Sequence, residues 1–120
     1  MKSHTVTAIL VALALSGARA EEAATTVRGY VLDSACAFIK NLNKPVSKDC
    51  AIACAKAGSP LVILADDGTI YWPISSAMPA AGQNLRLMKF AVEKIMASGK
   101  VFEKGGTRAI VIEKIEVAGK

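Results

Sequence analysis

Three cysteines are the residues of this chain whose types and spacing say most about chemistry. Cys50 and Cys54 stand four positions apart, and Cys36 lies upstream of both. On a helix, residues four apart share one face with Cβ atoms about 5–6 Å apart, whereas a disulfide needs about 3.5–4.5 Å. We therefore expect a structural disulfide from Cys36 to Cys54 or to Cys50. It would close a loop of about 15–19 residues and add roughly 3 kcal/mol of stability.

Two alternatives use all three thiols. Cys36, Cys50 and Cys54 together suit a soft ion such as Cu(I), or zinc if Asp33 or water supplies a fourth ligand. A thiol-redox protein would instead use the third cysteine to exchange or resolve a disulfide. The spacing does not match a thioredoxin-like or c-type haem motif, which has two residues between its cysteines. The disulfide interpretation involves no cofactor, and it is the main prediction.

The only histidine, His4, lies in a segment with the features of a signal peptide. Residues 1–20 have a short basic start, an apolar run over 6–15, and Ala-Arg-Ala at 18–20, the pattern read by signal peptidase. The apolar run is shorter than the about 20 residues that span a bilayer. We therefore predict a periplasmic or secreted protein, cleaved after Ala20 and not stably inserted in a membrane afterwards.

Cleavage would leave a chain without histidine and with a small positive charge. The absence of histidine excludes Ser-His and Cys-His catalytic pairs and Cys/His zinc sites, so we expect no enzymatic activity. Residues 21–120 hold 13 basic and 10 acidic residues, a net charge of +3. The lysines are scattered along the chain, which argues against nucleic acid as a partner. The expected partner is an unknown small molecule, a peptide or an envelope protein.

The first half of the mature chain predicts a strand and then a helix. Residues 21–26 are polar and predict a flexible lead-in, and residues 27–33 alternate as a strand does. Ser47 is a plausible N-cap and Gly58 a left-handed C-terminal residue for a short helix over 48–56. The cysteine pair therefore falls on a helix inserted after the first strand.

A hairpin is the strongest local signal in the chain. Residues 61–65 and 69–72 are rich in strand-forming types and flank a tight turn in which Gly68 takes a positive φ. Tyr71 and Trp72 are adjacent in the second strand, so their rings must face opposite sides of the sheet.

The last third of the chain predicts a helix followed by two long strands. Asn84 is a candidate cap for the helix, and the pattern changes from helix to strand near Val92. The two strands then flank a Gly-Gly turn at 105–106.

The complete pattern is mainly β, with five strands, the cysteine helix after the first, and a second helix between strands three and four. This is the element order of an OB-fold, a small closed barrel, and we predict one OB-like domain over residues 27–118. In OB-folds the second and third strands form the ligand platform. Tyr71 and Trp72, together with Tyr30 on the first strand, are therefore candidate ligand contacts.

Two resemblances accompany these patterns. Residues 91–117 resemble the last two strands of exported bacterial OB domains, except that Val92 stands where those domains have a glycine. Almost the whole mature chain resembles a group of small uncharacterised exported bacterial proteins that share G-x-V-x-D-x-x-C and C-x-x-x-C-x-x-x-G. The matching residues are Gly29, Val31, Asp33 and Cys36, followed by Cys50, Cys54 and Gly58. Some members have a histidine where this chain has Ser47.

The resemblance implies an exported OB-like barrel and no particular activity. Taken with the residues themselves, it predicts a non-enzymatic binding protein of the cell envelope, stapled by the disulfide described above. The alternative is a thiol-based metal or redox protein that uses the three cysteines.

Overall fold

The barrel consists of five strands that close on themselves in the order β1-β2-β3-β5-β4. The computed structural model describes residues 21–119, so the predicted signal peptide over 1–20 lies outside the described residues. The strands are β1 (Glu21–Asp33), β2 (Leu61–Ala65), β3 (Ile70–Pro73), β4 (Lys94–Lys104) and β5 (Thr107–Val117). β1 is antiparallel to both β2 and β4, whereas β3 is parallel to β5. This topology confirms the predicted OB-like barrel.

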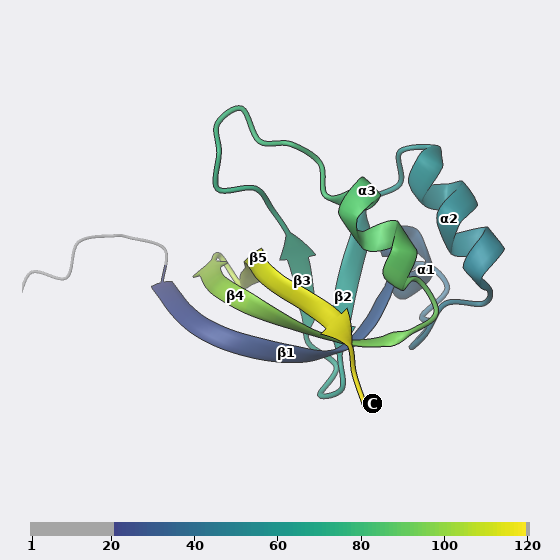
Figure 1. Cartoon of the computed structure of the whole chain (residues 1–120), viewed down its shortest axis with the longest axis horizontal. Helices are drawn as coiled ribbons and strands as arrows, with labels where there is room; N and C mark the ends of the chain where they lie inside the picture. The colour runs from purple at the N-terminus through teal and green to yellow at the C-terminus, as the bar shows by residue number, and fades with distance from the viewer. Residues whose placement is uncertain (1–20, 120) are drawn as a thin grey trace, which may run out of the picture.

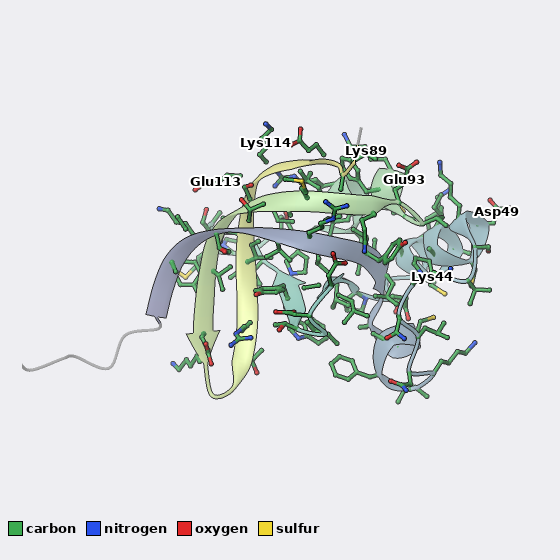
Figure 2. The ribbon with its side chains drawn as sticks, turned by 90° about the horizontal axis from the view of Figure 1, so that it is seen from below. Lys44, Asp49, Lys89, Glu93, Glu113 and Lys114 are labelled. Atoms are coloured by element: carbon green, nitrogen blue, oxygen red, sulfur yellow. The ribbon has the colours of Figure 1, made fainter. Side chains whose placement is uncertain are left out.

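Short helices occupy two of the connections, as the sequence predicted. The helices are α1 (Ser34–Phe38) and α2 (Lys48–Lys56) between β1 and β2, and α3 (Asn84–Leu87) and the 3₁₀ turn η1 (Met88–Phe90) between β3 and β4. They gather at one end of the barrel (Figure 1). Figure 2 shows Lys44 and Asp49 at this end, far from the turn that joins β4 to β5. Within residues 21–119, no helix is long and apolar enough to cross a membrane.

β1 begins six residues earlier than expected. Residues 21–26, predicted to be a flexible lead-in, pair with β4 from Glu21 opposite Glu103 to Thr26 opposite Ser98. The hydroxyl groups of Thr26 and Ser98 are 3.0 Å apart and hydrogen-bonded. The prediction relied on the polar composition of these residues. Strand pairing uses backbone groups, however, and a strand exposed to solvent needs no apolar side chains. β1, β4 and β5 together form a long curved arm (Figure 1).

The apolar residues form two clusters on opposite sides of the barrel wall. Fully buried members of the interior cluster are Val31, Ile63, Leu87, Ile95, Ala97 and Ile110. The outer cluster comprises Leu32, Ala37 and Val62, bordered by Cys36, Leu42, Leu64, Ile70 and Trp72. Val31 and Leu32 belong to different clusters because neighbours along a strand face opposite sides. The outer cluster anchors α1 on the barrel, and so positions Cys36.

Two glycines permit close approaches that closure of the barrel requires. At Gly29, β1 is paired with both β2 and β4, and a Cβ there would collide with the carbonyl oxygen of Leu64. At Gly99 the pairing of β4 with β5 shifts register, and a Cβ would collide with the carbonyl oxygen of Val111. Bulges and glycines of this kind let strands bend around a small barrel.

Val92 adopts a left-handed backbone conformation, with φ 74°. A β-branched residue seldom takes this conformation, which glycine adopts without strain. β4 begins at Lys94, two residues later, which confirms the predicted change from helix to strand near Val92.

Candidate functional site

Asp33 connects the end of β1 to the segments that carry the cysteines. Its buried carboxylate accepts the backbone N–H of Cys36 at 3.1 Å, which makes Asp33 the N-cap of α1. The other carboxylate oxygen accepts the hydroxyl of Ser59, just after α2. The backbone N–H of Ser34 also donates to the carbonyl of Pro60 at 2.9 Å. Asp33 therefore positions Cys36, and both of its oxygens are already engaged.

The cysteine helix α2 has the two ends that the sequence predicted. The hydroxyl of Ser47 accepts the backbone N–H of Cys50 at 3.1 Å, which confirms the N-cap. Gly58, after the last turn, has φ 100° and allows the chain to leave the helix in a left-handed conformation.

Asn84 fastens the C-terminal end of α2 to the barrel instead of capping its own helix. Its side-chain amide donates to the carbonyls of Ala55 at 3.0 Å and Ser59 at 2.8 Å, and its oxygen accepts the N–H of Leu61 at 3.0 Å. Gln83 occupies the N-cap position of α3 and makes no side-chain cap bond there. The predicted capping role of Asn84 was wrong because it considered only the local chain, whereas the amide bonds to groups far away in sequence.

The three cysteines line one small cavity. Cys36 comes from α1 and Cys50 and Cys54 from α2, and the cavity measures about 10 Å³. The remaining walls are Leu32, Asp33, Pro45, Val46 and Ala51. Such a volume holds about one water-sized group. The structure therefore brings together the three thiols that the sequence singled out, in a space too small for an organic ligand.

All three thiols are free in the structure, and no two of them are joined. The disulfide from Cys36 to Cys54 or Cys50 therefore stays a prediction. Among residues 21–119, no three Cys, His, Asp or Glu side chains are arranged to hold a metal ion. A metal centre at the cysteines would need their side chains to move closer together.

The thiols of Cys36 and Cys54 resist ionisation. Burial raises the pKa of Cys36 above its ordinary value, and the negative charge of Asp33 raises it further. Burial also raises the pKa of Cys54, with smaller contributions from Cys50 and Asp33. Reactive redox cysteines have lowered pKa values, because their surroundings stabilise the thiolate. The raised pKa values of Cys36 and Cys54 are therefore opposite to those of a reactive redox thiol.

A groove of about 480 Å³ crosses the outer face of β3, and it is the second candidate site. Its walls come from α1, the β2–β3 turn, β3 and the start of β5. The lining residues are Phe38, Gly68, Thr69, Ile70, Trp72, Gly106, Thr107 and Arg108. The rings of Phe38 and Trp72 stack, with centroids 6.1 Å apart and planes inclined by 16°. The volume lies in the range of small-molecule sites.

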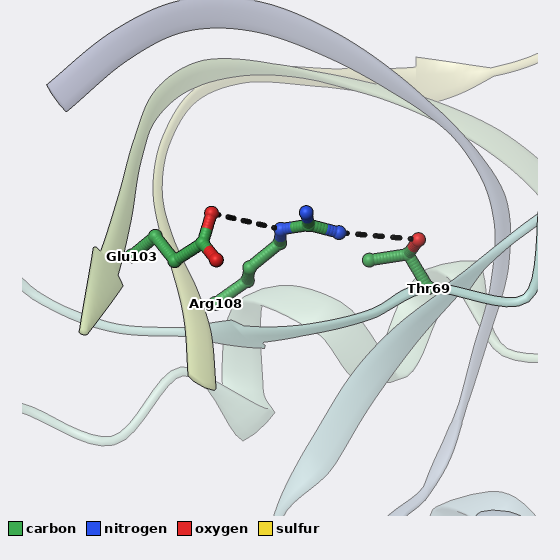
Figure 3. A network of polar contacts seen from close by, with 3 residues as sticks. All are labelled: Thr69, Glu103 and Arg108. Carbon is green, nitrogen blue, oxygen red and sulfur yellow. Dashed lines mark hydrogen bonds and ion pairs between the residues drawn. The ribbon is translucent and has the colours of Figure 1, made fainter. Parts of the chain in front are cut away.

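Arg108 supplies the positive charge of this groove. Its Nε donates to Glu103 Oε2 at 3.4 Å and its Nη1 donates to Thr69 Oγ1 at 3.4 Å (Figure 3). Hydrogen bonds of guanidinium groups to oxygen are usually 2.7–3.2 Å long. Both bonds are therefore weak, and the Arg108 side chain is 42% exposed, so its guanidinium can take another partner.

The structure separates the three aromatic residues that the sequence assigned to a ligand platform. Trp72 lines the groove, whereas Tyr71, its neighbour in β3, packs against the interior cluster. Tyr30 lines a different hollow of about 230 Å³, where Lys94 Nζ lies 5.0 Å from the centre of its ring. The alternation of β3 predicted that one of the two adjacent rings would face inward, and it did not say which one.

Sequence reasoning missed Phe38 and Arg108. Phe38 lies on α1, a helix that the sequence did not predict. Arg108 follows the predicted Gly-Gly turn between the last two strands, and in an OB-fold this turn borders the ligand platform. That position is the one sequence signal that could have pointed to Arg108.

No family model, curated protein or solved structure matches this chain. Its candidate sites are therefore interpreted from their own geometry.

Proposed function

We propose that the protein is a non-enzymatic binding protein, exported to the cell envelope, that holds a small ligand with a flat apolar part and an acidic group. The groove at Trp72 carries this proposal. Phe38 and Trp72 offer stacked aromatic faces, and Arg108 offers a weakly engaged guanidinium. Aromatic side chains bind flat groups by stacking, and arginine suits carboxylate, sulfonate or phosphate oxygens.

The thiol cavity has a supporting role in this proposal. With a volume of about 10 Å³ it excludes an organic ligand, so the cysteines serve stability. A disulfide from Cys36 to Cys54 or Cys50 would join α1 to α2. Phe38 stands two residues after Cys36 on α1, so the same bond would also restrain one wall of the groove.

The groove can be tested directly because Trp72 is the only tryptophan of the chain. Anilinonaphthalene sulfonate, a flat aromatic anion, is the probe. We expect saturable binding at one site, with Trp72 fluorescence quenched by energy transfer to the probe. Arg108→Gln and Phe38→Ala should each weaken binding at least about fivefold, the size of one lost charge-assisted bond or ring contact.

Met78→Ser is the matched control, because Met78 is an exposed apolar residue that does not line the groove. It should bind the probe as the unmodified protein does. Equal binding by all four proteins, or an Arg108→Gln variant that binds fully, would refute the groove as an anion site.

A thiol-based metal or redox protein is the second candidate, and the meeting of three cysteines at one cavity favours it. Thiols that remain protonated at neutral pH can still ionise when Cu(I) or zinc binds, because binding displaces the proton. The two candidates differ in the number of free thiols. Protein purified from the periplasm is denatured, and its thiols are titrated with and without a chelator.

One reactive thiol without the chelator supports the disulfide and the binding protein. Three thiols that react only after chelation support the metal centre. Three thiols that react both with and without the chelator, in protein never exposed to reductant, contradict both the disulfide and the metal site.

A further inference from the structure

The loop between α1 and α2 combines exposed apolar side chains with lysines. Ile39 is 84% exposed and Val46 is 71% exposed. Three lysines in the same ten-residue stretch, 39–48, are also exposed: Lys40, Lys44 and Lys48. We call residues 39–48, the connection together with the first residue of α2, the basic loop. Exposed apolar groups beside clustered positive charge are features of surfaces that bind other molecules.

The basic loop carries three positive charges and no negative charge. Residues 21–120 hold 13 basic and 10 acidic residues, and residues 34–48 include three lysines and no acidic residue. The remainder of 21–120 therefore has ten residues of each sign. Figure 2 places Lys44 at the helical end of the molecule, the end that also carries Asp49 in the first turn of α2. Residues 34–48 thus carry a local charge of +3, which Asp49 follows in the first turn of α2.

The basic loop is anchored by two of its apolar residues and exposes two others. Leu42 packs against the outer cluster, and its N–H donates to the carbonyl of Cys36 at 3.0 Å. Pro45 is buried at the thiol cavity. Leu42 and Pro45 therefore make the main contacts of the loop with the barrel. Ile39 is left in solvent, and Val46 borders the thiol cavity with most of its surface exposed.

We propose that the basic loop attaches the protein peripherally to anionic phospholipid surfaces. Ile39 and Val46 enter the boundary between headgroups and acyl chains, and the three lysines contact the negative headgroups. Nucleic acid also attracts lysines, but it offers stacking to aromatic rings and little to exposed aliphatic tips. The aliphatic pair therefore favours a membrane. This proposal is independent of the groove and of its ligand.

The test is sedimentation with vesicles of phosphatidylcholine alone or mixed with phosphatidylglycerol. The chain that begins at Glu21 is used, since it contains every strand and helix of the described structure. Binding to the mixed vesicles should exceed binding to phosphatidylcholine alone. Each lysine near an anionic surface is worth about fivefold in binding, so replacing Lys40, Lys44 and Lys48 by Gln should weaken it roughly a hundredfold.

Two controls distinguish binding by the basic loop from effects of net charge and of exposed apolar residues elsewhere. Replacing Lys89, Lys104 and Lys114 by Gln changes the net charge equally, and Figure 2 shows Lys89 and Lys114 away from Lys44. This variant should keep most of its binding. Ile39→Ser should weaken binding in raised salt, whereas Leu85→Ser, which alters an 85% exposed leucine on α3, should not.

The proposal is overturned if both triple variants lose binding equally, or if Leu85→Ser weakens binding as much as Ile39→Ser. It is also overturned if a single-stranded DNA at equal salt binds more tightly than the mixed vesicles, because the loop would then select nucleic acid. Circular dichroism of each variant verifies that the barrel is intact.

Discussion

Arg108 Nε lies 3.4 Å from Glu103 Oε2, across the turn that joins β4 to β5. The two residues are also opposite each other in the strand register, so the pair bridges the β4–β5 hairpin. Surface ion pairs of this kind contribute about 0–1 kcal/mol to stability. An acidic ligand therefore competes with Glu103 for the guanidinium at little energetic cost.

Removing this competition should strengthen ligand binding. We expect Glu103→Gln to bind anilinonaphthalene sulfonate more tightly, by about two- to fivefold, because a negative charge beside the groove is lost. Glu113→Gln is the control, since Glu113 lies on β5 and is exposed, and it makes the same change in net charge. Fluorescence titration of Trp72 measures both. Equal tightening in the two variants would show an effect of net charge alone.

Val92→Gly should stabilise the protein. Val92 holds a left-handed backbone at φ 74°, which costs a non-glycine residue about 1–2 kcal/mol, and its side chain is 39% exposed. Relief of strain should exceed the greater flexibility of the unfolded chain, for a net gain of about 0.5–1 kcal/mol. Urea unfolding measures the change. Val117→Gly, at a 37% exposed valine in β5, should destabilise instead, because glycine weakens strands. A loss of stability in Val92→Gly would contradict the strained backbone.

Asn84→Ala should lower stability by about 2–4 kcal/mol. It removes three hydrogen bonds and leaves backbone groups of Ala55, Ser59 and Leu61 without their partner. Asn84→Asp keeps an acceptor for the N–H of Leu61 and loses both donors. Its free energy of unfolding should therefore lie between those of the unmodified protein and of Asn84→Ala. Gln83→Ala removes only a local bond to Ala81 and should change little. Guanidinium unfolding gives the free energies, and an Asn84→Ala variant as stable as Gln83→Ala would contradict the anchoring role.

Reduced protein should lose stability as the pH rises above the ordinary thiol range. The pKa values of Cys36 and Cys54 are raised in the folded state, so the unfolded chain ionises first. The contribution of the two thiols to the free energy of unfolding is fully present below their pKa in the unfolded chain. It is lost as the pH rises through their raised pKa in the folded protein. Urea midpoints between pH 7 and pH 10, in the presence of a reductant, measure this loss. The Cys36→Ala, Cys54→Ala double variant should show a weaker dependence, and an unchanged slope would assign the effect to other groups.

The agreement between sequence and structure is best where the signal is local. Ser47 and Gly58 bracket α2 as predicted, and the turn at Gly68 joins β2 to β3. Caps and turns depend on a few neighbouring residues, so periodicity and residue type suffice to find them. The predicted ligand platform agrees with the structure only in part. Strand alternation places Tyr71 and Trp72 on opposite faces of the sheet, but it does not say which face is the interior.

The sequence by itself determined a five-stranded barrel with helices in two connections, since strand and helix patterns follow from residues close in the chain. It also predicted that Cys50 and Cys54 do not bond to each other, and that one of them bonds to Cys36 instead. Only the tertiary structure decided that all three thiols share one small cavity and that Phe38, Trp72 and Arg108 line one groove. Phe38, Trp72 and Arg108 come from α1, β3 and β5. Trp72 and Arg108 meet because β3 pairs in parallel with β5 when the barrel closes, and the ring of Phe38 stacks on that of Trp72. Contacts made by closure join residues distant in the chain, which local patterns do not specify.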